Sequence, residues 1–131
     1  MPRVRLRSFD ALDIALRETV LRLLLEALVA ENVAYLRSHP DTPQLRDSGV
    51  RYVEDPPWRE EWKDIAETLS RKAGDCKDLV AWRLAELRLQ GEVAATARVT
   101  VYEDGARVIN HITIRRADGQ IEDPSRELGL V

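Results

Sequence analysis

The hydrophobic pattern of the chain changes period once, at Gly91, and this change constrains the fold class. Before Gly91, apolar residues recur every three or four positions, over residues 12–36 and again over 79–87, as on one face of an α-helix. After Gly91, apolar and polar residues alternate through Val93, Ala95, Ala97, Val99 and Val101, as in a half-buried strand. Helices followed by strands predict an α+β domain, not a βαβ repeat.

Three helices are expected ahead of Gly91, and they cover residues 8–38, about 64–70 and roughly 76–90. The first stops at Ser38-His39-Pro40, because proline cannot continue a helix. Its apolar residues lie around much of the helix circumference, and this apolar surface is larger than the packing of one helix face on a small domain would bury. We interpret it as a central core helix; the alternative is a surface for a partner or for a second copy of the chain.

Two Asp-Gly dipeptides, at 104–105 and 118–119, divide the remaining residues into strands, because Asp-Gly is typical of tight hairpin turns. The expected strands cover about 93–102, 107–116 and 120–123. They predict a three-stranded antiparallel sheet, against which the helix over 76–90 packs.

Length and charge exclude several classes of protein. The 131 residues suit a single domain, 1–131, and 20 basic against 23 acidic side chains give a net charge of −3, so neither DNA nor RNA is an expected partner. The most apolar stretch, Val20–Ala30, is too short to cross a membrane, and no export signal precedes it. One cysteine and two histidines exclude a disulfide framework and fall short of a structural zinc site. We expect neither metal nor cofactor, and a cytoplasmic location.

The single thiol lies where a nucleophile is wanted. Cys76 begins the third expected helix, within Gly74-Asp75-Cys76-Lys77-Asp78. Unpaired backbone amides and the positive dipole end at a helix N-terminus favour a thiolate. Asp75 opposes this with its own negative charge, and the sequence leaves the net effect open. Asp78 is interpreted as structural, because an acid in the first helical turn complements the dipole.

His111 and Asp123 are the candidate base and its orienting partner. If the turn at 117–119 is a three-residue loop with a bulge, Asp123 lies opposite Thr113 and diagonal to His111, on the same face of the hairpin. If the turn has only two residues, Asp123 faces the other way. Register therefore decides whether this carboxylate can orient the imidazole.

These residues carry a resemblance to a known superfamily. Gly74-Asp75-Cys76-Lys77-Asp78 opening a helix, then His111, then Asp123-Pro124, resembles the transglutaminase-like branch of the papain-like cysteine enzymes, over residues 50–126. The segment from Arg51-Tyr52 through Trp62 to Cys76 also resembles small transglutaminase-like proteins of phages and prophages. The resemblance implies a papain-like core with Cys76 as nucleophile, His111 as base and Asp123 holding the imidazole.

The function so implied is thiol acyl transfer. Such an enzyme is a hydrolase or acyltransferase that acts on an amide bond, peptide or isopeptide, of a protein or peptide substrate. An oxyanion hole beside the Cys76 amide would take a further donor, and Tyr52, Trp58 and Trp62 stay open for that role. The alternative is a non-catalytic phage virion or head–tail assembly protein that keeps the fold, binds other phage structural proteins or itself through the 8–38 helix, and is virion-associated.

The remaining polar residues receive plain interpretations. His39, beside the proline that ends the first helix, is expected to be solvated. The charged residues from Arg59 to Glu67 are expected to form a hydrated surface. Neither group predicts a ligand site.

Overall fold

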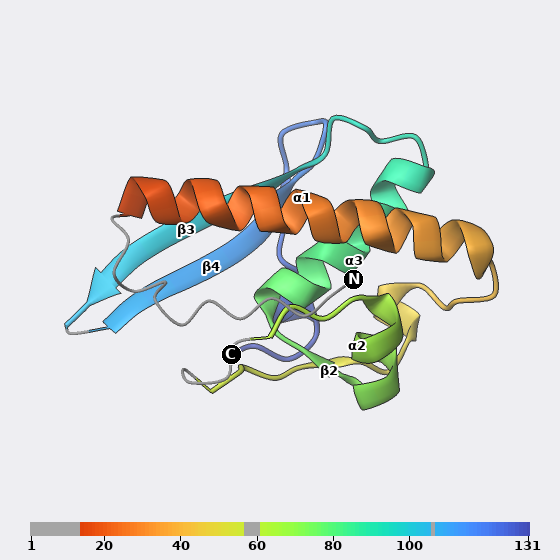
Figure 1. Ribbon diagram of the computed structural model, residues 1–131, viewed down its shortest axis with the longest axis horizontal. Coiled ribbons are helices and arrows are strands. Elements are labelled where there is room, and N and C mark those ends of the chain that lie inside the picture. The colour runs from red at the N-terminus through yellow and green to blue at the C-terminus, as the bar shows by residue number, and fades with distance from the viewer. Residues whose placement is uncertain (1–13, 57–60, 106) are drawn as a thin grey trace.

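The computed structural model describes residues 14–56, 61–105 and 107–131, and Figure 1 shows how they are arranged. Its longer elements are helices α1 (Ile14–Ser38), α2 (Ile65–Arg71) and α3 (Cys76–Leu89) and strands β3 (Thr96–Asp104) and β4 (Arg107–Arg115). The shorter ones are the 3-10 turn η2 (Leu45–Asp47), strands β1 (Arg51–Tyr52), β2 (Ala73–Gly74) and β5 (Ile121–Glu122), and helix α4 (Pro124–Glu127). The expected start of the first helix, residues 8–13, lies outside the described residues.

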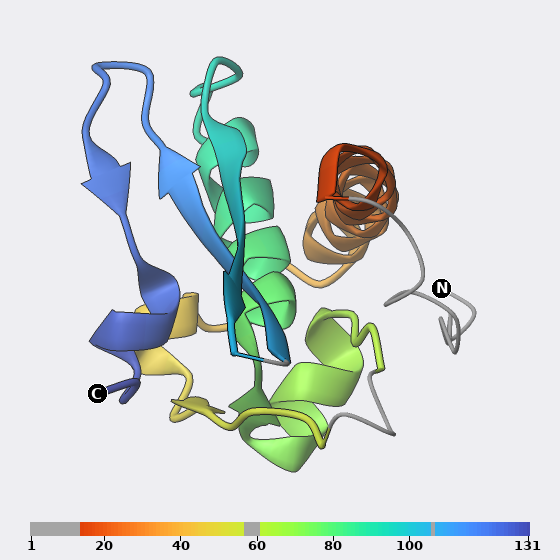
Figure 2. The ribbon, with the colours of Figure 1, turned by 90° about the vertical axis from the view of Figure 1, so that its left-hand side faces the viewer.

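The fold is α+β, as expected, with helices on an antiparallel sheet of order β3-β4-β5. Helix α3 lies against the sheet, mainly on β4, and α1 packs beside it on α3 and β3 (Figures 1 and 2). The main core gathers apolar side chains from both helices and the sheet, among them Leu21, Leu25, Leu28, Val80, Leu84, Val99, Ile112 and Ile114. Burying side chains of this size contributes about 1.5–3 kcal/mol each, which fixes α1 and α3 on the sheet.

Helix α1 is a core helix, which confirms the interpretation favoured from its sequence. Leu25 and Leu28 are fully buried and lie in the main core. Some apolar side chains of α1 lie outside the core: Leu23, on the outer face, is 67% exposed, and Leu16 is 47% exposed. In the part of the chain that the structure describes, no helix has the length and hydropathy that a membrane span requires.

A second, smaller core lies on the other side of α3 and joins the short elements. It contains Leu45, Val50, Ile65, Leu79, Trp82 and Leu128. Strand β1 runs parallel to β2, with Tyr52 opposite Gly74, and the Tyr52 amide donates to the carbonyl of Leu128 at 2.9 Å. These contacts bring the segment before α2 and the C-terminal segment to the N-terminal end of α3.

The hairpin that carries the candidate triad has the register of the three-residue loop. Ile114 pairs with Glu122, and Arg115 pairs with Ile121. The amide of Arg116 donates to the carbonyl of Gln120 at 2.8 Å, and Gly119 has a φ of 89° that suits glycine. This confirms the first of the two registers, in which Asp123 shares a face with His111.

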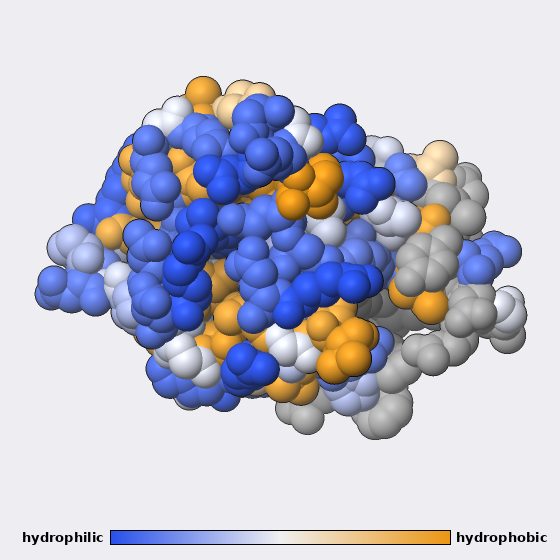
Figure 3. All heavy atoms as spheres, turned by 180° about the vertical axis from the view of Figure 1, so that it is seen from behind, coloured by the Kyte–Doolittle hydropathy of each residue, from blue (hydrophilic) through white to orange (hydrophobic). Residues whose placement is uncertain are grey.

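Two expected element bounds are wrong at their ends. Strand β3 begins at Thr96, later than the alternation from Val93 predicts, because the first residues after α3 form turns in which the Glu92 amide returns to the carbonyl of Leu87 at 2.9 Å. Strand β5 stops at Glu122, and Asp123 is already the N-cap of α4. Seen from behind, the molecule presents a mainly hydrophilic face with scattered apolar groups (Figure 3).

The burial pattern of α1 predicts unequal effects of two leucine truncations. Leu25→Ala should lower the free energy of unfolding by about 2–5 kcal/mol, because it leaves a cavity in the main core. Leu23→Ala, on the outer face of the same helix, should change it by less than about 0.5 kcal/mol. Urea denaturation followed by circular dichroism measures both. Equal losses would contradict the placement of the two side chains.

Candidate active site

Cys76 occupies the first position of α3, held there by a capping box. The Asp75 carboxylate accepts from the Asp78 amide, and the Asp78 carboxylate accepts from the Asp75 amide at 3.1 Å. Gly74 precedes them at a point of close approach, since a Cβ there would lie 3.1 Å from Thr68 Cγ2 and 3.2 Å from Leu79 Cδ2. The Gly-Asp-Cys sequence thus suits a strand that turns at once into a buried helix.

His111 and Asp123 form the hydrogen-bonded pair that the register predicts. His111 Nε2 lies 2.8 Å from Asp123 Oδ2. The other carboxylate oxygen of Asp123, Oδ1, accepts from the backbone N–H of Arg126 as the α4 cap at 3.3 Å. Both side chains of the pair are partly exposed, at 27% and 18%. The cap therefore orients the carboxylate, and the carboxylate orients the imidazole.

The sulfur of Cys76 lies on the main chain of β4 beside His111. Sγ is 4.0 Å from the carbonyl oxygen of Asn110, and the backbone N–H of Ile112 donates to it. Alternate residues of a strand direct their N–H and C=O groups to the same edge, and here that edge is the one that β5 leaves after Glu122. The sulfur thus contacts backbone groups of β4 that β5 leaves without a strand partner.

Of the three predicted residues, His111 and Asp123 are bonded to each other, and Cys76 is close to the backbone of β4 and not to the ring of His111. Two neighbours of His111 in β4 contact Sγ through their backbone, and the ring itself bonds to Asp123. Within the described residues no hydrogen bond joins Cys76 Sγ to the imidazole. The half of the triad made by His111 and Asp123 is in place, and Cys76 lies next to the His111 backbone.

Burial raises the pKa of the Cys76 thiol to about 12, and the Asp75 carboxylate adds to this rise. Lys77 and the Ile112 amide act in the opposite direction and are outweighed. The expectation that the helix N-terminus would yield a thiolate is therefore wrong for this conformation. The cause is desolvation, because the sulfur packs against the main core.

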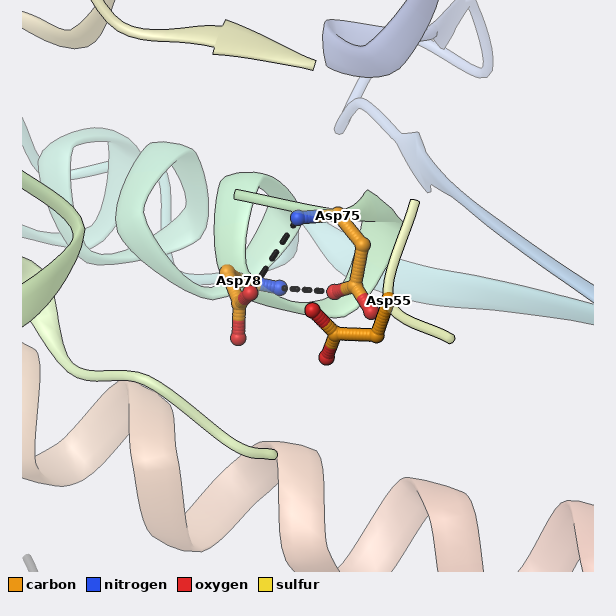
Figure 4. A group of neighbouring side chains, drawn as sticks. All are labelled: Asp55, Asp75 and Asp78. Atoms are coloured by element: carbon orange, nitrogen blue, oxygen red, sulfur yellow. Dashed lines mark hydrogen bonds between the residues drawn. The ribbon is translucent and has the colours of Figure 1, made fainter. Parts of the chain in front are cut away.

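Three carboxylates lie side by side under the start of α3, as Figure 4 shows. Oxygens of Asp55, Asp75 and Asp78 all lie within 4.8 Å of one another, a spacing that could hold a cation. Two ammonium groups already meet them: Lys63 Nζ is 3.0 Å from Asp78 Oδ2, and Lys77 Nζ bonds to Asp75 and is 3.3 Å from Asp55. Protein cations thus offset most of this charge.

Electrostatics differ within this cluster of three aspartates and two lysines. Burial, followed by the charge of Asp78, raises the pKa of Asp75 well above its ordinary value. Asp55 is also desolvated, but Lys77 and the Glu61 amide outweigh that and lower its pKa. Asp55 therefore stabilises the fold at neutral pH, and this contribution is lost as the pH falls toward its folded-state pKa.

The expected hydrated surface over 59–67 is wrong for its middle. Residues 59 and 60 lie outside the described residues, but Glu61, Trp62 and Lys63 are all buried, at 3–4% exposure. Lys63 lies in the aspartate cluster, and Glu61 pairs with Arg71 at 3.5 Å. Trp62 belongs to the main core, and Lys77 Nζ lies 5.6 Å from the centre of its ring. Glu61 and Lys63 can be buried because an opposite charge offsets the desolvation of each.

Among the aromatic residues considered for the oxyanion hole, Tyr52 lies at the site. Trp58 is outside the described residues, and Trp62 is buried in the core. Tyr52 is half-buried and pairs with Gly74, two residues before Cys76. Burial, together with the negative charge that Cys76 would carry, raises the pKa of Tyr52 to about 12. Its side chain packs against the second core, and its phenol keeps its proton at neutral pH.

Sequence reasoning missed the groups that surround the thiol. The Asn110 carbonyl and the Ile112 amide belong to the backbone and carry no residue signature. Asp55 and Lys63 are distant in sequence from α3 and meet its first turn only through the fold, Asp55 at Lys77 and Lys63 at Asp78. The only local signal for this charge cluster was the presence of both acidic and basic residues at Asp75, Lys77 and Asp78. The same pattern is typical of an exposed helix start, so it did not indicate burial.

The buried thiol should react slowly with iodoacetamide, a reagent that reports the thiolate population. At pH 8 we expect native Cys76 to be alkylated at least about tenfold more slowly than a free cysteine, because its pKa is raised to about 12. The rate should climb as pH rises toward that value. Mass spectrometry of the native and the urea-unfolded protein measures it, the unfolded chain providing the free-thiol rate. Native labelling faster than unfolded labelling would disprove the buried neutral thiol.

The aspartate cluster predicts a large cost for removing one of its cations. Lys63→Met should lower the free energy of unfolding by about 3–5 kcal/mol, since it leaves Asp78 buried without its ammonium partner. Arg88→Met is the matched control: it removes the cation facing Glu26, whose side chain is 52% exposed, and should cost about 0–1 kcal/mol. Urea denaturation at neutral pH compares them. A loss below 1 kcal/mol for Lys63→Met would show that Asp78 finds another partner or takes up a proton.

Comparisons with known proteins add no assignment to this geometry. The chain was compared with protein-family models, curated proteins and solved structures, and none of them matched. The chemistry of the site therefore rests on its own groups: a thiol at a helix N-terminus with its sulfur against β4, and an imidazole of β4 with a carboxylate 2.8 Å from it.

Proposed function

We propose that the protein is a thiol acyl-transfer enzyme of the transglutaminase-like, papain-like type, which acts on an amide bond of a protein or peptide. One observation carries the proposal: His111 Nε2 is bonded to Asp123 Oδ2 at 2.8 Å, while Cys76 Sγ lies against the β4 backbone on either side of the same histidine. The order of nucleophile helix, histidine strand and aspartate after a hairpin supports the papain-like assignment.

The tautomer of His111 suits the role of general base. Because Nε2 faces the Asp123 carboxylate, Nε2 carries the proton in the neutral ring, and Nδ1 is the nitrogen with a free electron pair. Nδ1 is also the ring nitrogen closer to the histidine's own backbone, which is where the sulfur lies. The proposed mechanism requires Sγ and Nδ1 to come together in the substrate complex, since catalytic hydrogen bonds often tighten only when substrate binds.

The raised pKa of the thiol defines the first chemical step. Since Cys76 rests as a neutral thiol, its proton passes to His111 Nδ1 as the sulfur attacks the amide carbonyl, so no thiolate precedes the attack. The negative charge moves to the carbonyl oxygen. The Cys76 amide, at the start of α3, and the Tyr52 phenol are the donors we assign to that oxyanion.

Collapse of this intermediate releases an amine and leaves a thioester on Cys76. The C–N bond breaks, and the leaving nitrogen takes the proton from His111. In the second half, His111 removes a proton from water or from an acceptor amine, which attacks the thioester and restores the thiol. Water gives hydrolysis, and an amine gives transamidation.

The second candidate function is a non-catalytic assembly domain, and the burial of the sulfur favours it. A thiol packed on the main core with its pKa raised to about 12 is what an inert structural cysteine shows. In this case His111 and Asp123 would serve only to cap α4. The exposed leucines of α1, Leu16 and Leu23, would then be the first surface to examine for a partner, such as a virion protein.

Acylation by p-nitrophenyl acetate separates these functions. The enzyme should form an acetyl-thioester on Cys76 faster than a free cysteine peptide does, despite its slow alkylation, because His111 takes the proton during attack. His111→Ala should reduce the acylation rate by at least about a hundredfold and Asp123→Asn by at least about tenfold. Nitrophenol release gives the rate, and intact mass gives the site.

Cys76→Ser supplies the background for this assay, since it removes the thioester while keeping a similar volume. Circular dichroism of each variant checks that the fold is retained. If His111→Ala acylates as fast as the wild type, the imidazole is not the base, and the assembly function replaces the enzymatic one.

A further inference from the structure

We infer that the ion pair between Arg83 and Glu122 is a positioning device that holds Asp123 against His111. This inference rests on the proposed function, because positioning Asp123 matters only if Asp123 orients His111 for catalysis. Arg83 and Glu122 themselves act on the site only through Asp123. Arg83 lies on α3, and Glu122 directly precedes Asp123 at the end of β5. The pair thus links the nucleophile helix to the third member of the triad.

The contact has the geometry of a two-point grip. Arg83 Nε donates to Glu122 Oε2 at 3.0 Å, and a terminal nitrogen of Arg83 lies 3.3 Å from Glu122 Oε1. Both side chains are only 10–11% exposed. A bidentate pair of guanidinium and carboxylate restricts direction as well as distance, which a single ammonium contact does not.

Strand β5 gains little from its own pairing, although α4 directly after it packs on α3. It consists of two residues, and its pairing with β4 is limited to Ile114 with Glu122 and Arg115 with Ile121. The chain leaves the sheet immediately afterwards, at Asp123. A strand this short at a sheet edge frays readily, and fraying would withdraw the carboxylate from the imidazole.

The nucleophile and the grip share one face of the same helix. Cys76 and Arg83 are seven residues apart, which is about two turns of α-helix. The same side of α3 that meets β4 through the sulfur therefore meets β5 through the guanidinium. Arg83 is itself fixed by Glu86, whose Oε1 accepts from it at 3.2 Å, so the grip is anchored within a buried helix.

Other charges near Asp123 do not replace this grip. Arg116 reaches Glu122 Oε1 at 3.5 Å, but its main partner is Glu92, at 2.6 and 2.7 Å. Arg126 lies 3.4 Å from Asp123 Oδ2, yet its side chain is 71% exposed, so its pull on the carboxylate is weak. Of these cations, Arg83 is the one that is both buried and anchored.

The test is the tautomer of His111, read from long-range ¹H–¹⁵N NMR spectra at about pH 8.5, where imidazoles are neutral. The wild type should show the proton on Nε2, facing Asp123. Glu122→Gln keeps the size of the side chain but removes the charge, and it should shift the spectrum toward the mixed tautomers of Asp123→Asn. Its acylation rate should fall at least about tenfold. Glu26→Gln, which breaks the exposed pair with Arg88 on the same helix, should change neither readout.

Two results would overturn the inference. One is a Glu122→Gln spectrum identical to the wild type when Asp123→Asn alters it; the other is an equal change in Glu26→Gln. Should Glu122→Gln fail to fold, Arg83→Lys, which retains the charge but loses the two-point contact, takes its place with the same expected shift. The tautomer readout does not need turnover, so a wild type without acylation disproves the proposed function and leaves the positioning role to be judged by NMR.

Discussion

Helix α3 is enclosed, and its burial is the constraint on which the rest of the structure depends. Every residue from Lys77 to Leu87 is buried, including charged ones. A buried charge is tolerated only when a partner offsets its desolvation, so three of the four find an opposite charge in another segment: Lys77 with Asp55, Asp78 with Lys63, Arg83 with Glu122. The fourth, Glu86, pairs with Arg83 and accepts from the backbone N–H of Leu45. The connecting segments, which have few apolar residues of their own, are thereby fixed around the helix.

This enclosure also governs the chemistry of the thiol. The same packing that fixes Cys76 removes water from its sulfur, so the helix dipole does not suffice to ionise it, and the pKa rises to about 12. The His111–Asp123 pair lies nearer to solvent, with partly exposed side chains. In the proposed mechanism, this difference in burial suits a step in which the proton moves from the thiol to the imidazole during bond formation. It does not suit a resting ion pair.

The sequence was informative where a pattern is local. The change of period at Gly91 predicted the order of helices and strands, and the Asp118-Gly119 turn predicted the register that places Asp123 on the His111 face. It was uninformative where long-range charge pairing decides burial. Glu61 and Lys63 have the composition of a surface, and only Arg71 and the aspartate cluster make them interior residues. Strand β2 and helix α4, of two and four residues, are too short to produce a period.

The hairpin and the helix must be placed together for a triad to exist here. A sheet sets the distance between His111 and Asp123 through register, but β4 and β5 share only two residue pairs, so register has little strength of its own. The position of the sulfur comes from packing of α3 on the other residues of β4. Since Arg83 and Cys76 belong to one helix, any shift of α3 along the sheet would move the Cys76 thiol and, through Glu122, the end of β5 in the same direction. The distance between Cys76 and Asp123 would therefore change little during small movements of α3. If the two residues were held by independent elements, such movements would change that distance.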